Sequence, residues 1–375
     1  FSNVPHLRFP EFSGEWKETT LGKIAEITKG SGISKDQLSE QGSPCILYGE
    51  LYTKYKSEII NEVYSRTELD SSPLVKSKAN DVIIPCSGET AIDISTARCV
   101  LFNNILLGGD LNIIRLKYDD GGFFAYQLNG ARKKDIARVA QGVSVVHLYG
   151  ENLKHIRVYH PAIEEQKKIA RLLSLIDERI TTQNKIIEKL ESLIRGIYKT
   201  LLGESDQYRY LDELCEIKKG VQVNKEKLSE KGLYYVMNGG ITPSGYYDLY
   251  NTEANTISIS EGGNSCGYVQ YNYTPFWSGG HCYTLENISN VVDNRYLFHY
   301  LKANELQIMS LRIGSGLPNI QKKDLSAFRI PLPALNKQIN IAKALDALLY
   351  KITVDKNIYS TYKQQKEYLL QQMFI

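Results

Sequence analysis

Cysteine and histidine are scarce in this sequence, and neither is spaced as a metal site requires. The six cysteines stand singly, with no Cys-x-x-Cys pair, so the sequence indicates neither a zinc site nor a redox pair. No histidine has a second histidine four residues away, and His281 beside Cys282 is a single pair of metal-binding side chains without a second. We therefore expect no metal ion in this chain, and we expect reduced thiols in a cytoplasmic protein.

Long hydrophobic runs are also missing. No apolar stretch approaches the roughly 20 residues that a membrane-spanning helix needs. The first residues lack the apolar core of a secretory signal. The charges nearly cancel, since 45 Lys and Arg against 42 Asp and Glu give a formal net charge of +3. This weakly basic balance is compatible with binding nucleic acid alongside partners, but it is not that of a strongly basic arm.

Sequence motifs of catalysis are absent as well. Residues 30–35 (GSGISK) are glycine-rich but lack the spacing of a phosphate-binding loop and its final Ser or Thr. Glu216 and Lys218 have the Glu-x-Lys spacing of a nuclease element, but no Pro-Asp pair precedes them, and the equivalent Glu26 is followed by Thr28. The chain is therefore predicted to be a binding protein, with an enzyme that has a dispersed active site as an open alternative.

The chain does contain an internal repeat. A block at residues 21–30 (LGKIAEITKG) recurs with a shift of 190 residues at residues 211–220 (LDELCEIKKG). A second block that begins at Leu153 recurs at Leu325, a shift of 172 residues. The two copies agree at their ends and differ in their middles. Because a repeat decides the architecture before any local assignment, we predict one scaffold used twice to read two different things.

Each copy combines a mixed α/β module with a long helix. In the first module, β-rich runs occur at residues 81–85, 112–116 and 156–159, separated by glycine-containing turns. From residue 163 onward, apolar residues recur at alternating steps of four and three, as in a coiled coil. The same stripe returns 172 residues later, and Gln183 and Asp355 interrupt the two stripes at the same place. The stripe positions are Ile169, Leu173, Ile176, Ile180, Gln183, Ile187, Leu190, Ile194, Ile197 and Leu201, and then Ile341, Leu345, Leu348, Ile352, Asp355, Tyr359, Tyr362, Lys366, Leu369 and Met373.

Two stripes of this length predict two long helices that pair with each other. About 40 residues at 1.5 Å each make a helix of roughly 60 Å. The module between the helices must return the chain, so we expect the pairing to be antiparallel. A polar residue in such a seam lowers stability but specifies register. The alternative is that each stripe packs only on its own globular module.

The variable middle of the first module supplies candidate binding residues. Reading duplex DNA needs polar side chains on exposed loops for the base edges, and lysines or backbone amides for the phosphates. Loops at residues 29–35, 48–56, 86–90 and 140–147 meet this need, and Glu50 could accept from cytosine N4. The candidates are Lys29, Ser31, Lys35, Tyr48, Glu50, Tyr52, Lys54, Ser87, Glu89, Thr90, Gln141, Ser144 and His147.

The second module has counterparts at residues 219–224, 238–247, 261–267 and 314–319. Their side chains differ from those of the first module, as expected if each module reads its own sequence. Any one of these loops alone could be an ordinary surface turn, so the prediction depends on four loops that vary inside a repeated frame. The candidates are Lys219, Gln222, Asn224, Asn238, Thr242, Tyr246, Glu261, Asn264, Ser315 and Asn319.

Together these features resemble the specificity subunits of type I restriction-modification systems. The resemblance covers the whole chain and depends on the two-copy plan, the opening LRFPEFSGEWKETTLGKIAEITKG, the pre-helix PAIEEQKKIARLLSLID and the terminal QKEYLLQQMFI. It implies an α+β fold, with two mixed α/β target recognition domains separated by two long helices that form an antiparallel coiled coil. The implied division is residues 1–160 and 204–332 for the two domains, and residues 161–203 and 333–375 for the two spacer helices.

The resemblance also implies a function. Each domain would read one half of a bipartite DNA site, the helices would set the unread spacer, and the chain would have no active site. It would assemble with two methyltransferase subunits that bind S-adenosylmethionine, and with restriction and translocase subunits that use ATP and Mg²⁺. No cofactor would bind to this chain itself. The alternative is a coiled-coil scaffold with two protein- or carbohydrate-binding modules, because loops rich in tyrosine and glycine suit those ligands too.

Overall fold

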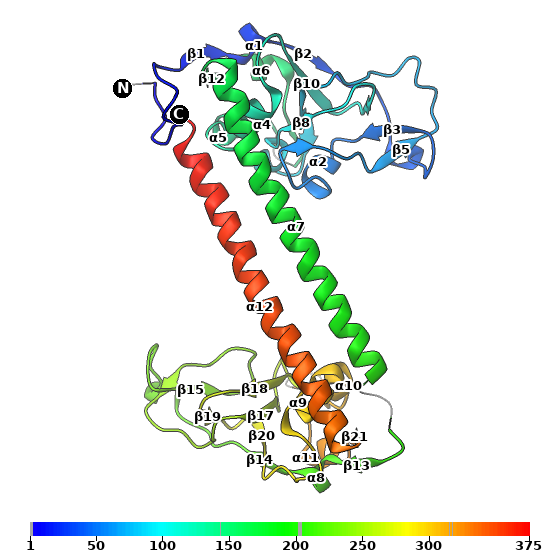
Figure 1. The fold of residues 1–375 in the computed structure, drawn as a ribbon, viewed down its shortest axis with the longest axis vertical. Helices are drawn as coiled ribbons and strands as arrows, with labels where there is room; N and C mark the ends of the chain where they lie inside the picture. The colour runs from blue at the N-terminus through cyan, green and yellow to red at the C-terminus, as the bar shows by residue number, and fades with distance from the viewer. Residues whose placement is uncertain (1–2, 143, 202–204, 315, 317) are drawn as a thin grey trace. The chain divides into compact units, whose positions relative to one another are not determined.

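The chain folds into two compact units in a computed structural model that describes residues 3–142, 144–201, 205–314, 316 and 318–375 (Figure 1). Unit 1 comprises Phe1–Asn184 and Asn357–Ile375, and unit 2 comprises Lys185–Lys356. Each unit therefore joins a globular part to one half of each of two long helices. The predicted division into two domains and two spacer helices cuts the chain differently, and it stays a prediction about function.

The globular part of unit 1 is built on a five-stranded sheet in the order β2-β10-β6-β8-β4. Every residue of the central strand β6 is buried, as expected of a continuous apolar run covered on both faces. Smaller sheets, β1-β12, β11-β7 and β5-β3-β9, lie around it. The elements are β1 (Lys17–Thr20), α1 (Leu21–Ile24), β2 (Ala25–Lys29), η1 (Lys35–Gln37), β3 (Ser43–Ile46), α2 (Glu50–Thr53), β4 (Ile59–Ile60), β5 (Ser65–Thr67), β6 (Asp81–Pro85), β7 (Ser87–Gly88), α3 (Ala91–Ile94), β8 (Arg98–Val100), β9 (Leu106–Leu107), β10 (Leu111–Leu116), α4 (Gly121–Asn129), α5 (Lys133–Val139), β11 (Val146–His147), α6 (Gly150–Lys154) and β12 (Arg157–His160).

Unit 2 repeats this plan with a four-stranded antiparallel sheet in the order β14-β20-β17-β18. A three-stranded sheet, β16-β15-β19, and a pair, β13-β21, accompany it. The elements are β13 (Tyr208–Tyr210), α8 (Leu211–Leu214), β14 (Glu216–Lys219), η2 (Lys225–Lys227), β15 (Tyr234–Met237), β16 (Tyr246–Tyr247), β17 (Thr256–Ser260), β18 (Val269–Asn272), β19 (Trp277–Ser278), β20 (Cys282–Glu286), α9 (Asn294–Ala303), α10 (Glu305–Ser310), α11 (Lys322–Ser326) and β21 (Arg329–Pro331).

The repeated Pro-Gln motif joins each globular part to its long helix in the same way. In unit 1 the Gln166 side chain donates to the Pro161 carbonyl (2.9 Å) and accepts from the Asp120 N–H (2.9 Å). In unit 2 the side chain of Gln338 donates to Pro333 (2.8 Å) and accepts from the N–H of Asp293 (2.9 Å). The carboxylates of Asp120 and Asp293 in turn cap α4 and α9. The glutamine thus ties the start of the long helix to the start of a helix in the globular part.

The two predicted long helices are present as α7 (Ile163–Leu201) and α12 (Leu335–Gln372). The predicted end of the first helix, near residue 203, lies outside the described residues. The stripe positions from Ile169 to Ile197 and from Ile341 to Met373 are buried or half-buried, which confirms the seam. The polar interruptions are buried too, with Gln183 at 8% and Asp355 at 2% exposure.

The two helices run antiparallel within each unit. In unit 1, Asp177 of α7 pairs with Lys366 of α12 (2.6 Å), and two residues further on Arg179 lies 5.9 Å from the ring of Tyr362. Partner numbers therefore fall as the α7 numbers rise. In unit 2, Glu191 pairs with Lys356 (2.8 Å). Further along α7, burial and the nearby charge of Asp346 raise the pKa of the Tyr198 hydroxyl to about 12, so Tyr198 lies near Asp346 of α12. The prediction of an antiparallel coiled coil is confirmed.

The helix halves also pack on the globular parts. In unit 1 the end of α12 lies beside the start of α7 (Figure 1), and Phe374 just beyond it packs against Trp16 and Phe123, with ring centroids 6.3 and 5.2 Å away. In unit 2 one core joins Ile194 of α7 and Leu345 of α12 to the residues of the sheet. The core of unit 1 therefore combines side chains that are far apart in sequence, such as Trp16 and Phe374.

Buried charges accompany this packing in unit 1. The Nζ of Lys366 lies 2.5 Å from Glu58 and 2.6 Å from Asp177, and the hydroxyl of Tyr126 donates to Asp177 (2.7 Å). Arg98, buried to 8% exposure, lies in the field of the same two carboxylates. In unit 2 a smaller group takes this place.

The smaller group in unit 2 centres on Asp346 of α12. This carboxylate accepts from Arg295 (2.9 Å), and its other oxygen lies 2.8 Å from Nε2 of the fully buried His299. His299 follows the capping Asp293 by six residues, as Tyr126 follows Asp120 in unit 1. The two units therefore use different polar residues at matching places.

Two observations bear on the class of protein. Among the residues described, no helix has both the length and the apolar character that crossing a membrane requires. All six cysteines lie in the described ranges, where they are buried and form no disulfide. Burial raises the pKa of the Cys86 and Cys282 thiols to about 11, so they are protonated at neutral pH.

Candidate functional site

The first predicted loop of unit 1 lies directly on the turn between β9 and β10. The N–H of Gly30 donates to the carbonyl of Leu111 (3.0 Å), and the N–H of Ser31 donates to Leu107 (2.9 Å). Lys29, Ser31 and Lys35 are exposed or half-buried in this loop. These two bonds lie on either side of the turn Gly108-Gly109-Asp110, which the loop therefore contacts directly.

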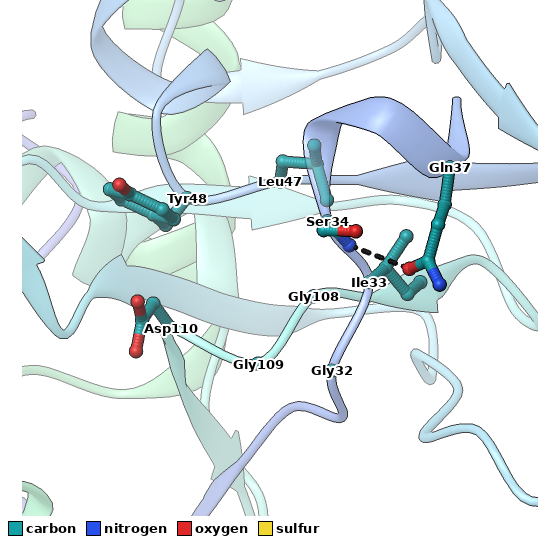
Figure 2. Close-up of a pocket in the computed structure, with 9 residues that line it drawn as sticks. All are labelled: Gly32, Ile33, Ser34, Gln37, Leu47, Tyr48, Gly108, Gly109 and Asp110. Atoms are coloured by element: carbon teal, nitrogen blue, oxygen red, sulfur yellow. Dashed lines mark hydrogen bonds between the residues drawn. The ribbon is translucent and has the colours of Figure 1, made fainter.

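A cavity of about 350 Å³ joins this loop to the start of the predicted loop at residues 48–56 (Figure 2). In Figure 2 the side chains of Tyr48 and Asp110 lie at one end of the cavity, and Ser34 and Gln37 lie at the other, where the Ser34 N–H donates to the Gln37 side chain (2.9 Å). The cavity is lined by Gly32, Ile33, Ser34, Gln37, Leu47, Tyr48, Gly108, Gly109 and Asp110.

The other two predicted loops of unit 1 pair with each other. Ser87 pairs with His147 in the β7–β11 sheet, and Gln141 and His147 exchange backbone hydrogen bonds of 2.9 and 2.7 Å. The hydroxyl of Ser87 donates to the carboxylate of Asp110 (3.2 Å), which links both loops to the turn. Glu89, Thr90, Gln141, Ser144 and His147 are exposed, whereas Ser87 is 8% exposed.

The structure places Glu50 inside the protein. It is 6% exposed, and its carboxylate accepts from the N–H of Leu47 (2.9 Å), from Lys54 (2.6 Å) and from the hydroxyl of Ser65. Tyr52 is half-buried in the same helix, and burial, with the charges of Tyr48, Glu89 and Asp93, raises the pKa of its hydroxyl.

In unit 2 the four predicted loops meet around the turn Gly279-Gly280-His281. Glu261, 7% exposed, accepts from Lys219 (2.6 Å) and lies 3.1 Å from Nδ1 of His281. The side chain of Asn238 accepts from the N–H of His281 (3.1 Å). Gln222 packs on the turn, since a Cβ on Gly280 would lie 2.7 Å from its side-chain oxygen.

The remaining candidates of unit 2 lie at the rim of this cluster. The N–H of Gly263 donates to Pro318 (3.0 Å), which joins the loop of Asn264 to the loop of Asn319. Asn224, Thr242, Asn264 and Asn319 are exposed and Tyr246 is half-buried. Ser315 lies outside the described residues. Within those ranges no three His, Cys, Asp or Glu side chains are grouped as a metal site.

The two sites share one backbone frame. In each unit the loop after the first sheet strand, the central turn and the last two loops exchange the same backbone hydrogen bonds, all between 2.8 and 3.0 Å. In unit 1 the N–H groups of Gly30, Ser31, Cys86 and Leu148 donate, in that order, to the carbonyls of Leu111, Leu107, Asp110 and Cys86. In unit 2 the N–H groups of Gly220, Val221, Glu261 and Ile320 donate, in the same order, to the carbonyls of Cys282, Ser278, His281 and Glu261.

Within this frame the side chains differ at most positions and agree at one. The lysine before the first glycine is common to both, as Lys29 and Lys219. Asp110 is replaced by His281 and Cys86 by Glu261, while Ser87 in the β7–β11 pair corresponds to Gly262, which bridges Asn319. The frame therefore presents the same cation in both units and different side chains at the other positions.

Sequence reasoning missed the residue after each glycine turn. Gly108-Gly109 was identified only as a turn, and His281 was considered only as a metal ligand. A comparison of the two middles would have found them, since a Gly-Gly pair followed by one polar residue and a buried strand occurs in both. The difference in length between the copies hid this match.

Comparison with known proteins gives consistent results. The family model described as the type I restriction modification DNA specificity domain matches residues 13–192 and 205–363. The specificity subunit of the MjaVIII type I restriction enzyme of Methanocaldococcus jannaschii is 34% identical over 391 aligned positions, which cover 93% of this chain and 88% of that protein. A protein of Mycoplasma pneumoniae named as a type I specificity subunit is 38% identical over 144 residues, and the match spans only 38% of its length.

Solved structures show the same fold. The crystal structure of a type I restriction-modification S subunit from Mycoplasma genitalium superimposes with a TM-score of 0.75, covering 99% of both chains at 20% identity. A chain from a structure of type I restriction-modification complex assembly superimposes with a TM-score of 0.54, at 16% identity over 96% of this chain.

Proposed function

The chain belongs to the type I restriction modification DNA specificity family, and we propose that it reads a bipartite DNA site, one half-site with each unit. The observation that carries this proposal is the shared frame with unlike side chains. One geometry used twice suits one kind of ligand, duplex DNA. Different side chains in that geometry suit two different base sequences.

The frame also separates two kinds of contact. Phosphate contacts orient a protein on DNA but carry no sequence information, whereas contacts to base edges specify the sequence. We assign Lys29 and Lys219, which the frame keeps, to the phosphates. The exposed residues that differ between the units, such as His147 and Asn319, are assigned to the bases.

We propose that three of the predicted DNA contacts orient neighbouring side chains instead of contacting DNA themselves. Glu50, Ser87 and Glu261 are each less than 9% exposed and hydrogen-bonded inside the site. Their burial favours a role in orienting Lys54, Asp110 and His281. The other predicted residues remain proposed DNA contacts.

The helices are proposed to set the unread spacer between the half-sites. Support comes from α7 and α12, which each run without a break from one unit into the other. Half-sites on one face of B-DNA recur about every 34–36 Å. A helix of 39 residues, about 58 Å long, is sufficient for such a separation.

Partners are proposed to supply the chemistry. The chain would assemble with two methyltransferase subunits that bind S-adenosylmethionine, and with restriction and translocase subunits that use ATP and Mg²⁺. The proposal places the chain in the cytoplasm, where the chromosomal DNA and these subunits are found.

Two measurements test the proposal. Sequencing of methylated adenines in cells carrying the native subunits should show one bipartite motif, which disappears when this chain is deleted. DNA binding by the assembled complex should weaken steeply as salt rises, and Lys29→Ala and Lys219→Ala should each reduce that salt slope by about one. Lys343→Ala, on the exposed face of α12, is the matched control. Binding that salt does not weaken would favour the alternative of a protein- or carbohydrate-binding scaffold.

A further inference from the structure

The central turn holds one side chain of each unit at the same place in the frame. Asp110 in unit 1 and His281 in unit 2 both follow a Gly-Gly pair, and the carbonyl of each accepts from the equivalent loop, through Cys86 (2.8 Å) or Glu261 (2.9 Å). Asp110 is exposed, and the side chain of His281 is 61% exposed. Both therefore project from a defined backbone position to the surface of the site.

The backbone of this turn has no room to move toward the neighbouring loop. A Cβ added at Gly30 would lie 2.0 Å from the carbonyl oxygen of Gly108, and one at Gly220 would lie 2.2 Å from that of Gly279. The two glycine backbones are in direct contact in each unit. A side chain at this position is therefore held on a rigid support, as a specificity-determining contact requires.

The chemistry of Asp110 selects a hydrogen-bond donor. An ionised carboxylate accepts hydrogen bonds and donates none. The Ser87 hydroxyl donates to its Oδ2 (3.2 Å), which orients the group. Tyr48 lies beside it at the same end of the cavity (Figure 2). In the major groove the amino group of cytosine, N4, is the donor that Asp and Glu read.

The chemistry of His281 is different. Its Nδ1 lies 3.1 Å from Glu261, whose other oxygen accepts from Lys219 (2.6 Å). This contact orients the ring and leaves Nε2 as the ring atom that can meet a ligand. The same backbone position thus presents an anionic acceptor in one unit and an oriented imidazole in the other.

We propose that this position determines specificity in both units, and that Asp110 accepts from cytosine N4 in the half-site read by unit 1. The proposal rests on the proposed function, since it names a base contact of the same site. It adds a residue that neither the loop candidates nor the family match assigns. The proposed ligand of Asp110 is a cytosine of duplex DNA, recognised from the major groove.

The decisive variant is Asp110→Asn. Asparagine keeps the shape of the side chain but offers a donor and an acceptor together, which match adenine N6 and N7. We expect the preference at one position of the first half-site to change from cytosine toward adenine by about ten-fold or more. Asp110→Ser should lose the preference for cytosine without gaining one for adenine. His281→Ala should relax one position of the second half-site only.

The experiment is selection of duplexes randomised at the half-site positions by the assembled complex, combined with sequencing of methylated adenines in cells. Asp70→Asn is the matched control, because it makes the same charge change in unit 1 while the hydrogen bonds that Asp70 accepts in the described residues come from Ser72 of its own turn. It should leave both half-sites unchanged. Melting temperatures of all variants, measured in parallel, detect any loss of folding.

Three results would overturn the inference. The first is a wild-type first half-site without a position that prefers cytosine. The second is an Asp110→Asn protein that folds and retains the wild-type preferences. The third is a change in both half-sites from the single substitution. By contrast, a wild-type complex that selects no bipartite motif would refute the proposed function itself.

Discussion

Unit 1 buries a network of charged side chains. Lys366 interrupts the apolar stripe of α12, yet its side chain is only 14% exposed and lies between Glu58 and Asp177. Burial and the nearby Glu58 raise the pKa of Asp177, while the pKa of Lys366 is raised because both carboxylates outweigh its burial. The cation thus compensates two buried anions.

Replacing Lys366 with methionine should therefore be costly. The Lys366→Met protein would keep two buried carboxylates without the cation that is paired directly with both, so we expect a loss of about 3 to 5 kcal/mol in the free energy of unfolding. Chemical denaturation with hydrogen exchange resolved by segment measures this, and the loss should be confined to unit 1. Lys356→Met is the control, because its half-exposed pair with Glu191 contributes about 1 kcal/mol or less. Equal losses in the two variants would contradict the importance of the buried network.

His299 should make the stability of unit 2 depend on pH. Burial lowers its pKa, and the contact with Asp346 opposes this only in part. Because an unfolded histidine titrates near ~6.5, the unfolded state binds more protons just below that pH. Stability is therefore fully present at neutral pH and is lost as the pH falls below about 6.5, by at most about 1.4 kcal/mol per pH unit. The Asp346 carboxyl, whose pKa is lowered because hydrogen bonds from Arg295 and His299 outweigh its burial, adds a further loss at lower pH.

Thermal unfolding of His299→Gln across pH 5 to 7.5 tests this. The variant should be less stable at pH 7 and show a flatter profile than the wild-type chain. His155→Gln, at an exposed histidine, should retain the wild-type profile. A wild-type profile in His299→Gln would show that another group dominates.

Helices and helix breaks could be predicted where the sequence pattern that specifies them is local. The seam of α7 and α12 follows from the spacing of apolar residues, and the break between α4 and α5 follows from Gly130. The partners of Lys366 could not be predicted, because Glu58 stands 308 positions away in sequence. The candidate site shows the same limit, in that loops such as residues 29–35 were predicted from composition and stay predictions. Asp110 was missed, because its place depends on backbone contacts across three strands.

The continuity of the two helices gives a test at the scale of elements. Inserting four residues into both, near residues 184 and 356, adds about 6 Å and about one turn to each. We expect the unread spacer to lengthen by about one to two base pairs, at 3.4 Å each, while both half-site sequences stay the same. Sequencing of methylated adenines in cells carrying this variant reads both quantities. An unchanged spacer would refute the proposal that the helices set it.

At the scale of the molecule, the two globular parts should act independently. Each has its own sheet and core, and each carries a complete copy of the site frame. Exchanging residues 205–330 for those of another family member should therefore change one half-site and leave the other half-site and the spacer as they were. The methylated motif of the chimera measures this. A change in both halves would mean that the units read DNA jointly.

The contribution of α12 to unit 1 has a consequence for how the protein is made. Trp16 and Phe123 leave the ribosome long before Phe374, which packs against them. The nascent chain must therefore expose this aromatic surface throughout most of translation, when chaperones can bind it. Unit 2 is continuous from Lys185 to Lys356 and can close earlier. The part of the protein that is synthesised first is thus the last to finish folding.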